Sequence, residues 1–93
     1  MTTHAVAILQ VTNPDSLAQY RDKAADALAK HGGSVVQASA DLKQIDGTAA
    51  APTVMAVLQF PDRDAADAWI NDPDLADVHA LRRNSGNSDI YVL

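Results

Sequence analysis

The sequence predicts an α+β domain in which four β-strands and two helices follow one another in the order βαββαβ. Residues 53–60 are apolar at nearly every position instead of every second one, which indicates a strand covered on both faces. Residues 4–12 have the same character. Only two helical patterns are present, so the helices can cover one face of a small sheet and leave the other face for a second copy of the chain.

Length and composition favour one domain that spans residues 1–93. A chain of this size buries about 60–65% of its unfolded surface, so its core is thin and dimerisation would stabilise it. The absence of cysteine excludes disulfides and thiolate chemistry. There is no pattern of a secretory signal and no apolar run of about 18 residues, so we expect a cytoplasmic protein with no membrane partner.

Charge and motif content exclude several kinds of partner. The net charge is −5, and all 12 acidic residues are Asp, so the surface repels phosphate backbones and we expect no nucleic acid partner. The three histidines lack the spacing of metal ligands, and Cys and Glu are absent, so no metal site is predicted. No cofactor is predicted either. There is no glycine-rich phosphate-binding loop, because Gly32-Gly33 follows a helix instead of opening one. Haem bound through His31 would need a larger pocket than this chain indicates.

The first helix is predicted from Asn13 to about His31, after a strand at residues 4–12. Asn is a good N-cap, proline suits the first helical position, and Asp15 complements the helix dipole. Gly32 and Gly33 end the helix. The apolar stripe of this helix contains residues at helical spacing, namely Leu17, Tyr20, Ala24, Ala27 and Leu28.

Residues 34–46 are too many for one ordinary strand of about 5–6 residues. We expect two strand pieces, at residues 35–38 and 42–46, with a bulge or bend near residues 39–41. Asp46-Gly47 begins the turn region that leads to the strand at residues 53–60.

The second helical region is predicted from Pro61-Asp62 to Arg83, and a strand at residues 88–93 follows it. Asp72-Pro73 interrupts the region and caps its continuation. The complete order is that of the ferredoxin-like fold, a four-stranded antiparallel sheet with two helices on one face. Two such sheets packed face to face form a dimeric α/β barrel, so we expect a homodimer.

Three short motifs carry a resemblance to a known family. They are Lys30-His31-Gly32-Gly33, Phe60-Pro61 followed by Ala65, Ala66, Ala68 and Trp69, and Ala80-Leu81-Arg82-Arg83-Asn84-Ser85. With these three motifs in this order, the chain resembles the domain-of-unknown-function family 1330 of the dimeric α/β-barrel superfamily. The resemblance covers almost the whole chain and implies a ferredoxin-like homodimer. Structural relatives of that family include cofactor-independent monooxygenases, muconolactone isomerase-like enzymes and chlorite dismutases, which is analogy at the level of the fold.

His31 and Arg82 are the predicted catalytic residues. Helical spacing places His31 toward the sheet, where burial opposes the helix dipole and a histidine could act as a general base. The alternative is a histidine that caps the helix. Arg82 shares a stripe with Leu75 and Val78, and buried arginine is rare without a partner. It could anchor a substrate carboxylate or phenolate, pair with an Asp, or extend to the dimer rim.

Three further residues are predicted to bind substrate. Trp69 and Tyr20 lie on apolar stripes, so core packing is the alternative for both, and Ser85 could instead be a turn residue. Arg83, His4 and His79 are expected at the surface. Because each helix runs opposite to the strand before it, Trp69 is expected near His31, and Tyr20 and Ser85 near Arg82. A single cavity between sheet and helices could still touch both ends.

Two functions of different kinds remain open. The first is a homodimeric protein that binds or transforms a small, partly apolar aromatic or oxo-acid metabolite by cofactor-free proton transfer. In it His31 is the base and Arg82 the anion anchor. The second is a non-catalytic ligand-binding or structural dimer, in which His31 caps a helix and Arg82 forms a structural ion pair.

Overall fold

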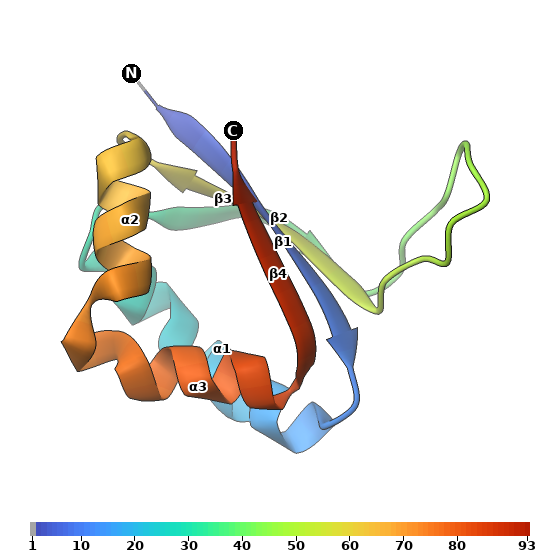
Figure 1. The fold of residues 1–93 in the computed structure, drawn as a ribbon, viewed down its shortest axis with the longest axis horizontal. Helices are drawn as coiled ribbons and strands as arrows, with labels where there is room; N and C mark the ends of the chain where they lie inside the picture. Colours follow the sequence, from blue (N-terminus) through green and yellow to red (C-terminus); the bar gives the residue numbers. More distant parts are fainter. Residues whose placement is uncertain (1) are drawn as a thin grey trace.

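The computed structural model describes residues 2–93 of the chain. Its elements are β1 (Thr3–Val11), α1 (Pro14–Ala29), β2 (Ser34–Ser39), β3 (Val54–Phe60), α2 (Arg63–Asn71), the 3₁₀ turn η1 (Pro73–Leu75), α3 (Ala76–Asn84) and β4 (Gly86–Val92). The predicted α+β, ferredoxin-like order is confirmed, and the second helical region is divided at Asp72-Pro73 as expected. The helices lie together on one side of the sheet (Figure 1).

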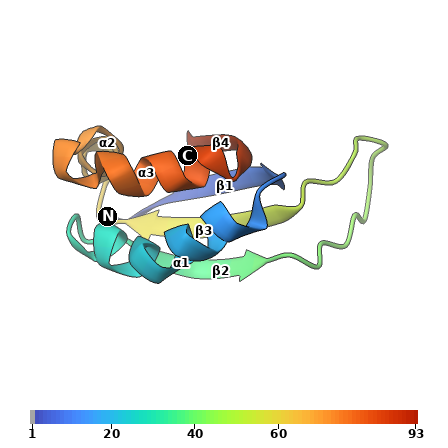
Figure 2. The same ribbon diagram turned by 90° about the horizontal axis from the view of Figure 1, so that it is seen from below.

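The sheet is antiparallel throughout, with the strand order β2-β3-β1-β4. It is open, with β2 and β4 at its edges (Figure 2). On the central strand β1, Ala5, Ala7 and Leu9 are buried beneath the helices. Val6 and Ile8 alternate with them and remain only half-buried, because no element of residues 2–93 covers that face.

Both helical regions begin with side-chain caps, of which Asn13 was predicted. The side chain of Asn13 accepts a hydrogen bond from the backbone of Ser16, and Asp62 accepts one from Ala65. The helix α1 ends at Ala29, two residues before the predicted end, so His31 lies in the turn that follows it. The hydroxyl of Ser16 then donates to the carbonyl of Leu81 over 2.7 Å and links α1 to α3.

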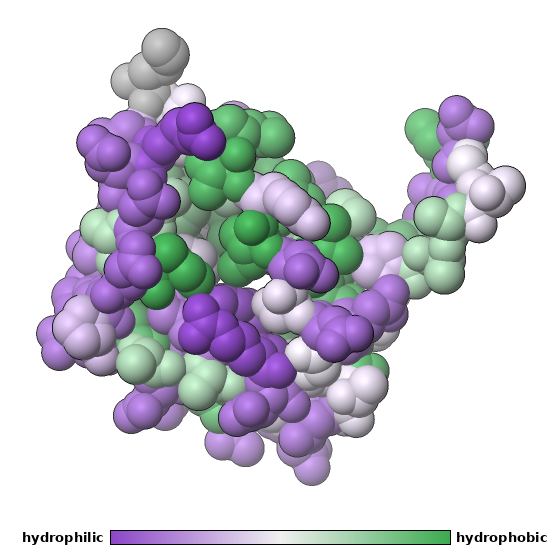
Figure 3. Space-filling view, in the orientation of Figure 1, coloured by the Kyte–Doolittle hydropathy of each residue, from purple (hydrophilic) through white to green (hydrophobic). Residues whose placement is uncertain are grey.

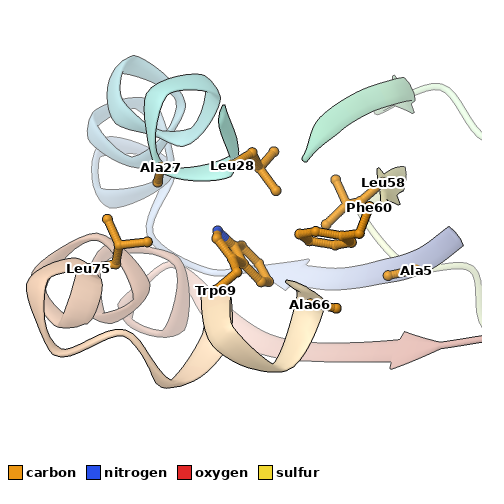
Figure 4. Close-up of a cluster of buried hydrophobic side chains, with 8 residues drawn as sticks. All are labelled: Ala5, Ala27, Leu28, Leu58, Phe60, Ala66, Trp69 and Leu75. Atoms are coloured by element: carbon orange, nitrogen blue, oxygen red, sulfur yellow. The ribbon is translucent and has the colours of Figure 1, made fainter. Parts of the chain in front are cut away.

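The core is centred on Trp69 and Phe60, which are 2% and 1% exposed and whose ring centroids lie 5.5 Å apart. Figure 4 shows both rings between α1, α2 and the sheet. The rest of this cluster is aliphatic: Ala5, Ala27, Leu28, Leu58, Ala66 and Leu75. Trp69 Nε1 is buried and has no hydrogen-bond partner among residues 2–93. Figure 4 draws this nitrogen on the ring edge nearer to α1.

The two glycines after α1 are required by close packing against the end of β3. Gly32 has φ of +73°, and a Cβ there would lie 2.9 Å from Pro61 Cγ. A Cβ on Gly33 would lie 2.8 Å from Phe60 Cε1. The motif Lys30-His31-Gly32-Gly33 therefore lies against Phe60-Pro61, and two of the sequence motifs form one contact.

The prediction for residues 34–46 is wrong in its second half. One strand, β2, spans Ser34–Ser39, and its pairing with β3 shifts register between Val35 and Gln37. Residues 42–46 form no strand, because β3 begins only at Val54 and offers them no partner. Residues 40–53 instead form a loop that projects from the body of the molecule (Figures 1 and 3), and Ile45 in it is 87% exposed.

Replacing Gly86 with alanine should be far more destabilising than replacing Gly47. Both glycines have positive φ, +149° and +97°, so each substitution strains the backbone. A Cβ on Gly86 would also fall 1.8 Å from the carbonyl oxygen of Gln10, whereas the nearest atom at Gly47 is 3.6 Å away. We expect Gly47→Ala to cost about 1 kcal/mol and Gly86→Ala at least about 3 kcal/mol in denaturant unfolding. Equal losses would contradict the tight approach of β4 to β1.

Candidate functional site

The candidate site is built around Arg82, a cation on α3 that is only 2% exposed. Its Nε donates to the hydroxyl of Ser88 on β4 over 3.2 Å. Its Nη1 donates to Nδ1 of His79 over 2.7 Å and to the hydroxyl of Tyr20 on α1 over 3.5 Å. Three elements thus hold the guanidinium in place.

The partners of Arg82 are all neutral. Its Cζ lies 5.5 Å from the centroid of the Tyr20 ring and 5.3 Å from that of Trp69, within the range of cation–π attraction. Among residues 2–93, no carboxylate lies within 4.0 Å of the guanidinium. The predicted alternative of a structural ion pair with an Asp is therefore not found. A buried charge is costly without a counter-charge.

A cavity of about 210 Å³ lies beside Arg82, between α1 and the sheet. Its lining is apolar apart from Tyr20, Arg21 and Arg82, so its charged residues are cations although the protein is acidic overall. Its walls are mostly small or aliphatic: Ala7, Leu9, Leu17, Ala24, Ala25, Leu28, Val35, Ala38, Val54, Ala56, Leu58 and Ile90. An apolar cavity of about 150 Å³ accepts benzene, so this one has room for a single substituted ring.

His79 is the main residue that the sequence analysis misplaced. We expected it at the surface, but it is 1% exposed and its ring meets that of Trp69 edge-on at 4.6 Å. Its Nε2 lies 2.9 Å from the carbonyl oxygen of Trp69, which can only accept a hydrogen bond. Nε2 therefore carries the proton, and Nδ1 is free to accept from Arg82. The spacing of apolar residues predicted that Val78 faces the core, whereas the buried face of α3 is centred on His79 and Arg82.

Burial lowers the pKa of His79, since the interior disfavours imidazolium, and the nearby Arg82 and Arg83 lower it further. The hydrogen bond to the Trp69 carbonyl and the charge of Asp72 oppose this shift. A neutral His79 agrees with the geometry, because an imidazolium would direct an N–H at Nη1 of Arg82.

His31 does not line the cavity, and its part-buried side chain pairs with Asp72 instead. Its Nε2 is 2.8 Å from Oδ2 of Asp72, which also lies 2.7 Å from Nζ of Lys30. Lys30 and His31 hold the pKa of Asp72 well below its usual range, and the backbone of Asp74 contributes. This group joins the end of α1 to the junction of α2 and η1. Arg82 lines the cavity and His31 does not, so the two predicted catalytic residues are not brought together there.

The predicted substrate-binding residues have different positions. Tyr20 lines the cavity, as the substrate-binding prediction requires. Trp69 does not line it, and its ring lies 5.3 Å from Cζ of Arg82. Ser85 is fully buried, and its hydroxyl donates to the carbonyl of Arg82 over 2.6 Å. The carbonyl of Ser85 accepts from Thr12 and Asn13, so this residue connects the end of α3 to the start of α1.

The family is shown by a sequence comparison. The model of the family described as Domain of unknown function (DUF1330) matches residues 2–93. The chain belongs to this family. No curated protein matches it. Within residues 2–93, no group of three or more His, Cys, Asp or Glu residues is placed to hold a metal ion, and no helix is long and apolar enough to cross a membrane.

Solved structures similar to this DUF1330 protein share its fold at low sequence identity. RPA0582 of Rhodopseudomonas palustris, a protein of unknown function, has a TM-score of 0.72 and 18% identity, covering 99% of this chain and 80% of that one. SnoaB of Streptomyces nogalater, a cofactor-independent oxygenase, has a TM-score of 0.71 and 16% identity, and the match covers 99% of this chain and 90% of that one. A dimeric ferredoxin-like protein of unknown function from Jannaschia sp. CCS1 has a TM-score of 0.68 and 13% identity, and the match covers 100% of this chain and 98% of that one. These likenesses show the fold alone.

The lowered pKa of His79 predicts a loss of stability in mild acid. The unfolded chain takes up this proton at its ordinary pKa of 6.5, and the folded chain does so only at lower pH. The free energy of unfolding should therefore fall as the pH drops below about 6.5. Denaturant unfolding at pH 7 and pH 5 measures this, and His79→Asn should lose less stability than the wild type between the two. Equal losses would mean that His79 is not held neutral.

Proposed function

We propose that this protein binds a small, partly apolar organic anion, with an aromatic or oxo-acid skeleton, in the cavity beside Arg82. The observation that carries the proposal is a buried guanidinium with only neutral partners at the wall of an apolar cavity. A ligand carboxylate or phenolate would supply the missing negative charge, and its ring would fill the apolar part. The cavity volume of about 210 Å³ favours a ligand with one ring.

Proton-transfer chemistry without a cofactor is the reaction that these side chains favour. A substrate that gives up a proton to solvent water would become an enolate or phenolate in the cavity, and Arg82 would stabilise that anion, because a desolvated cation acts strongly on charge that develops beside it. The hydroxyl of Tyr20 lies next to Arg82 and can donate to or accept from the same ligand atom. SnoaB supports the idea only in that a protein of this fold is a cofactor-independent oxygenase.

The assembly we propose is a homodimer in which two sheets pack face to face, forming the dimeric α/β barrel. The uncovered face carries apolar side chains of the two central strands, Val6 and Ile8 on β1 and Met55 and Val57 on β3. A bare apolar sheet face favours association. The Jannaschia structure, described as a dimeric ferredoxin-like protein, supports this arrangement.

Arg82 should be required for the binding of aromatic anions. We expect wild-type protein to bind benzoate and to bind benzamide at least tenfold more weakly, since only the carboxylate can pair with the guanidinium. Arg82→Met should remove this preference. Trp69 is the only Trp, so its single indole signal in ¹H–¹⁵N NMR spectra follows both titrations.

Arg83→Met is the matched control, because Arg83 is the next residue on α3 and is exposed. It removes the same charge and should bind benzoate as the wild type does. Equal binding of benzoate and benzamide by the wild type, or equal weakening in both variants, would contradict the proposed site.

The dimer can be tested on the bare sheet face. Light scattering should give the wild type about twice the chain mass of 9.8 kDa at micromolar concentration. Ile8→Asp places a charge on the central strand of that face and should give a monomer. Ala68→Asp, on the exposed side of α2, adds the same charge and should stay dimeric. A wild-type protein with the mass of one chain would rule out the assembly.

A further inference from the structure

The protein uses only some of the hydrogen-bond donors of Arg82. An arginine side chain has five N–H donors in a fixed plane, one on Nε and two on each terminal nitrogen. Ser88 accepts from Nε, and His79 and Tyr20 accept from Nη1. Nη2 donates to no atom of residues 2–93, and it is not among the buried atoms sealed off without a partner. Its two donors therefore remain available.

His79 makes the strongest contact with the guanidinium. The distance from Nη1 to Nδ1 is 2.7 Å, compared with 3.2 Å to Ser88 and 3.5 Å to Tyr20. The ring of His79 is itself fixed at both ends. Its Nε2–H is bonded to the carbonyl of Trp69, and its ring packs against the indole ring at an interplanar angle of 86°. A rigid acceptor of this kind determines where the plane of the guanidinium lies.

We propose that His79 is a positioning residue, whose neutral Nδ1 holds Nη1 of Arg82 so that Nη2 is presented to an anionic group of the ligand in the cavity. The inference rests on the anion site proposed above and adds how that site is kept in order. His79 does not touch the ligand, because it is 1% exposed and does not line the cavity. Its effect passes through Arg82 alone.

The ligand group that fits this arrangement is an oxyanion that binds Arg82 from the side of Nη2. Nη2 offers two N–H donors, and the Tyr20 hydroxyl lies beside Nη1 as a third polar contact. A carboxylate or sulfonate has several oxygens that can accept from these groups, whereas the matching amide has fewer acceptors and no charge. The site should therefore prefer oxyanions to neutral analogues of the same size.

Two substitutions of His79 separate its two hydrogen bonds. The side-chain oxygen of asparagine falls near the position of Nδ1, so His79→Asn retains an acceptor for Arg82 and loses the donor to Trp69. Glutamine reaches the position of Nε2, so His79→Gln retains the donor to the Trp69 carbonyl and loses the acceptor for Arg82. Both remove the ring from the core, and a packing role alone would make them similar.

The test is binding of p-toluenesulfonate at pH 7 by the full chain, with neutral p-toluenesulfonamide as the comparison ligand, measured by calorimetry. We expect wild type and His79→Asn to bind the sulfonate within about threefold of each other, and His79→Gln to bind it at least tenfold more weakly. Unfolding curves show that each variant is folded at the temperature of the titration. The ¹⁵N NMR shifts of the wild-type ring should independently show a proton on Nε2 and none on Nδ1.

The outcomes separate this inference from the function on which it rests. If the wild type does not prefer the sulfonate to the sulfonamide, the anion site itself is wrong. If the wild type prefers the sulfonate and both variants bind it equally, the site stands and the positioning role of His79 is overturned. A proton on Nδ1 in the wild type would overturn the role as well, whatever the affinities.

Discussion

The burial of Arg82 without a counter-charge is the constraint on which the interior of this protein depends. A guanidinium cannot lose its proton to escape a low-dielectric interior, so its surroundings must supply acceptors and polarisable faces. They do so with the Ser88 hydroxyl, His79 Nδ1, the Tyr20 hydroxyl and two aromatic rings. These groups come from α1, α2, α3 and β4. The contacts that hold this one cation therefore also hold the three helices in place against the sheet.

The aromatic cluster shows how the core and the site are joined. Phe60 lies at the end of β3, its ring packs on Trp69, Trp69 meets His79, and His79 accepts from Arg82. The close approach of Gly33 to Phe60 anchors the other end of this series to the turn after α1. A change in the packing of Phe60 is therefore expected to reach the guanidinium through rigid contacts and not through a flexible segment.

Local rules of sequence predicted most of the fold, because caps and apolar periodicity are local. Asn13-Pro14 and Asp72-Pro73 start and divide the helices as expected. Residues 42–46 have strand-like composition but no partner strand, which only the tertiary structure decides. His79 was misplaced because its burial depends on Arg82 and on the carbonyl of Trp69, and such mutual satisfaction leaves no periodic signal. His31 does not reach the cavity because α1 ends before it and its ring pairs with Asp72 instead. Because the helical region is interrupted at Asp72-Pro73, helical spacing counted across that point does not predict which side of the helix a residue lies on.

We attribute the negative charge opposite Arg82 to a bound small molecule and not to the protein. A crystal structure of the assembled protein, purified without added aromatic acids and followed by mass spectrometry of the same crystals, tests it most directly. We expect density for a small organic anion in the cavity, with an oxygen within hydrogen-bond distance of Arg82 Nη2. A protein carboxylate within 4.0 Å of the guanidinium, from the same chain or its partner, would contradict it.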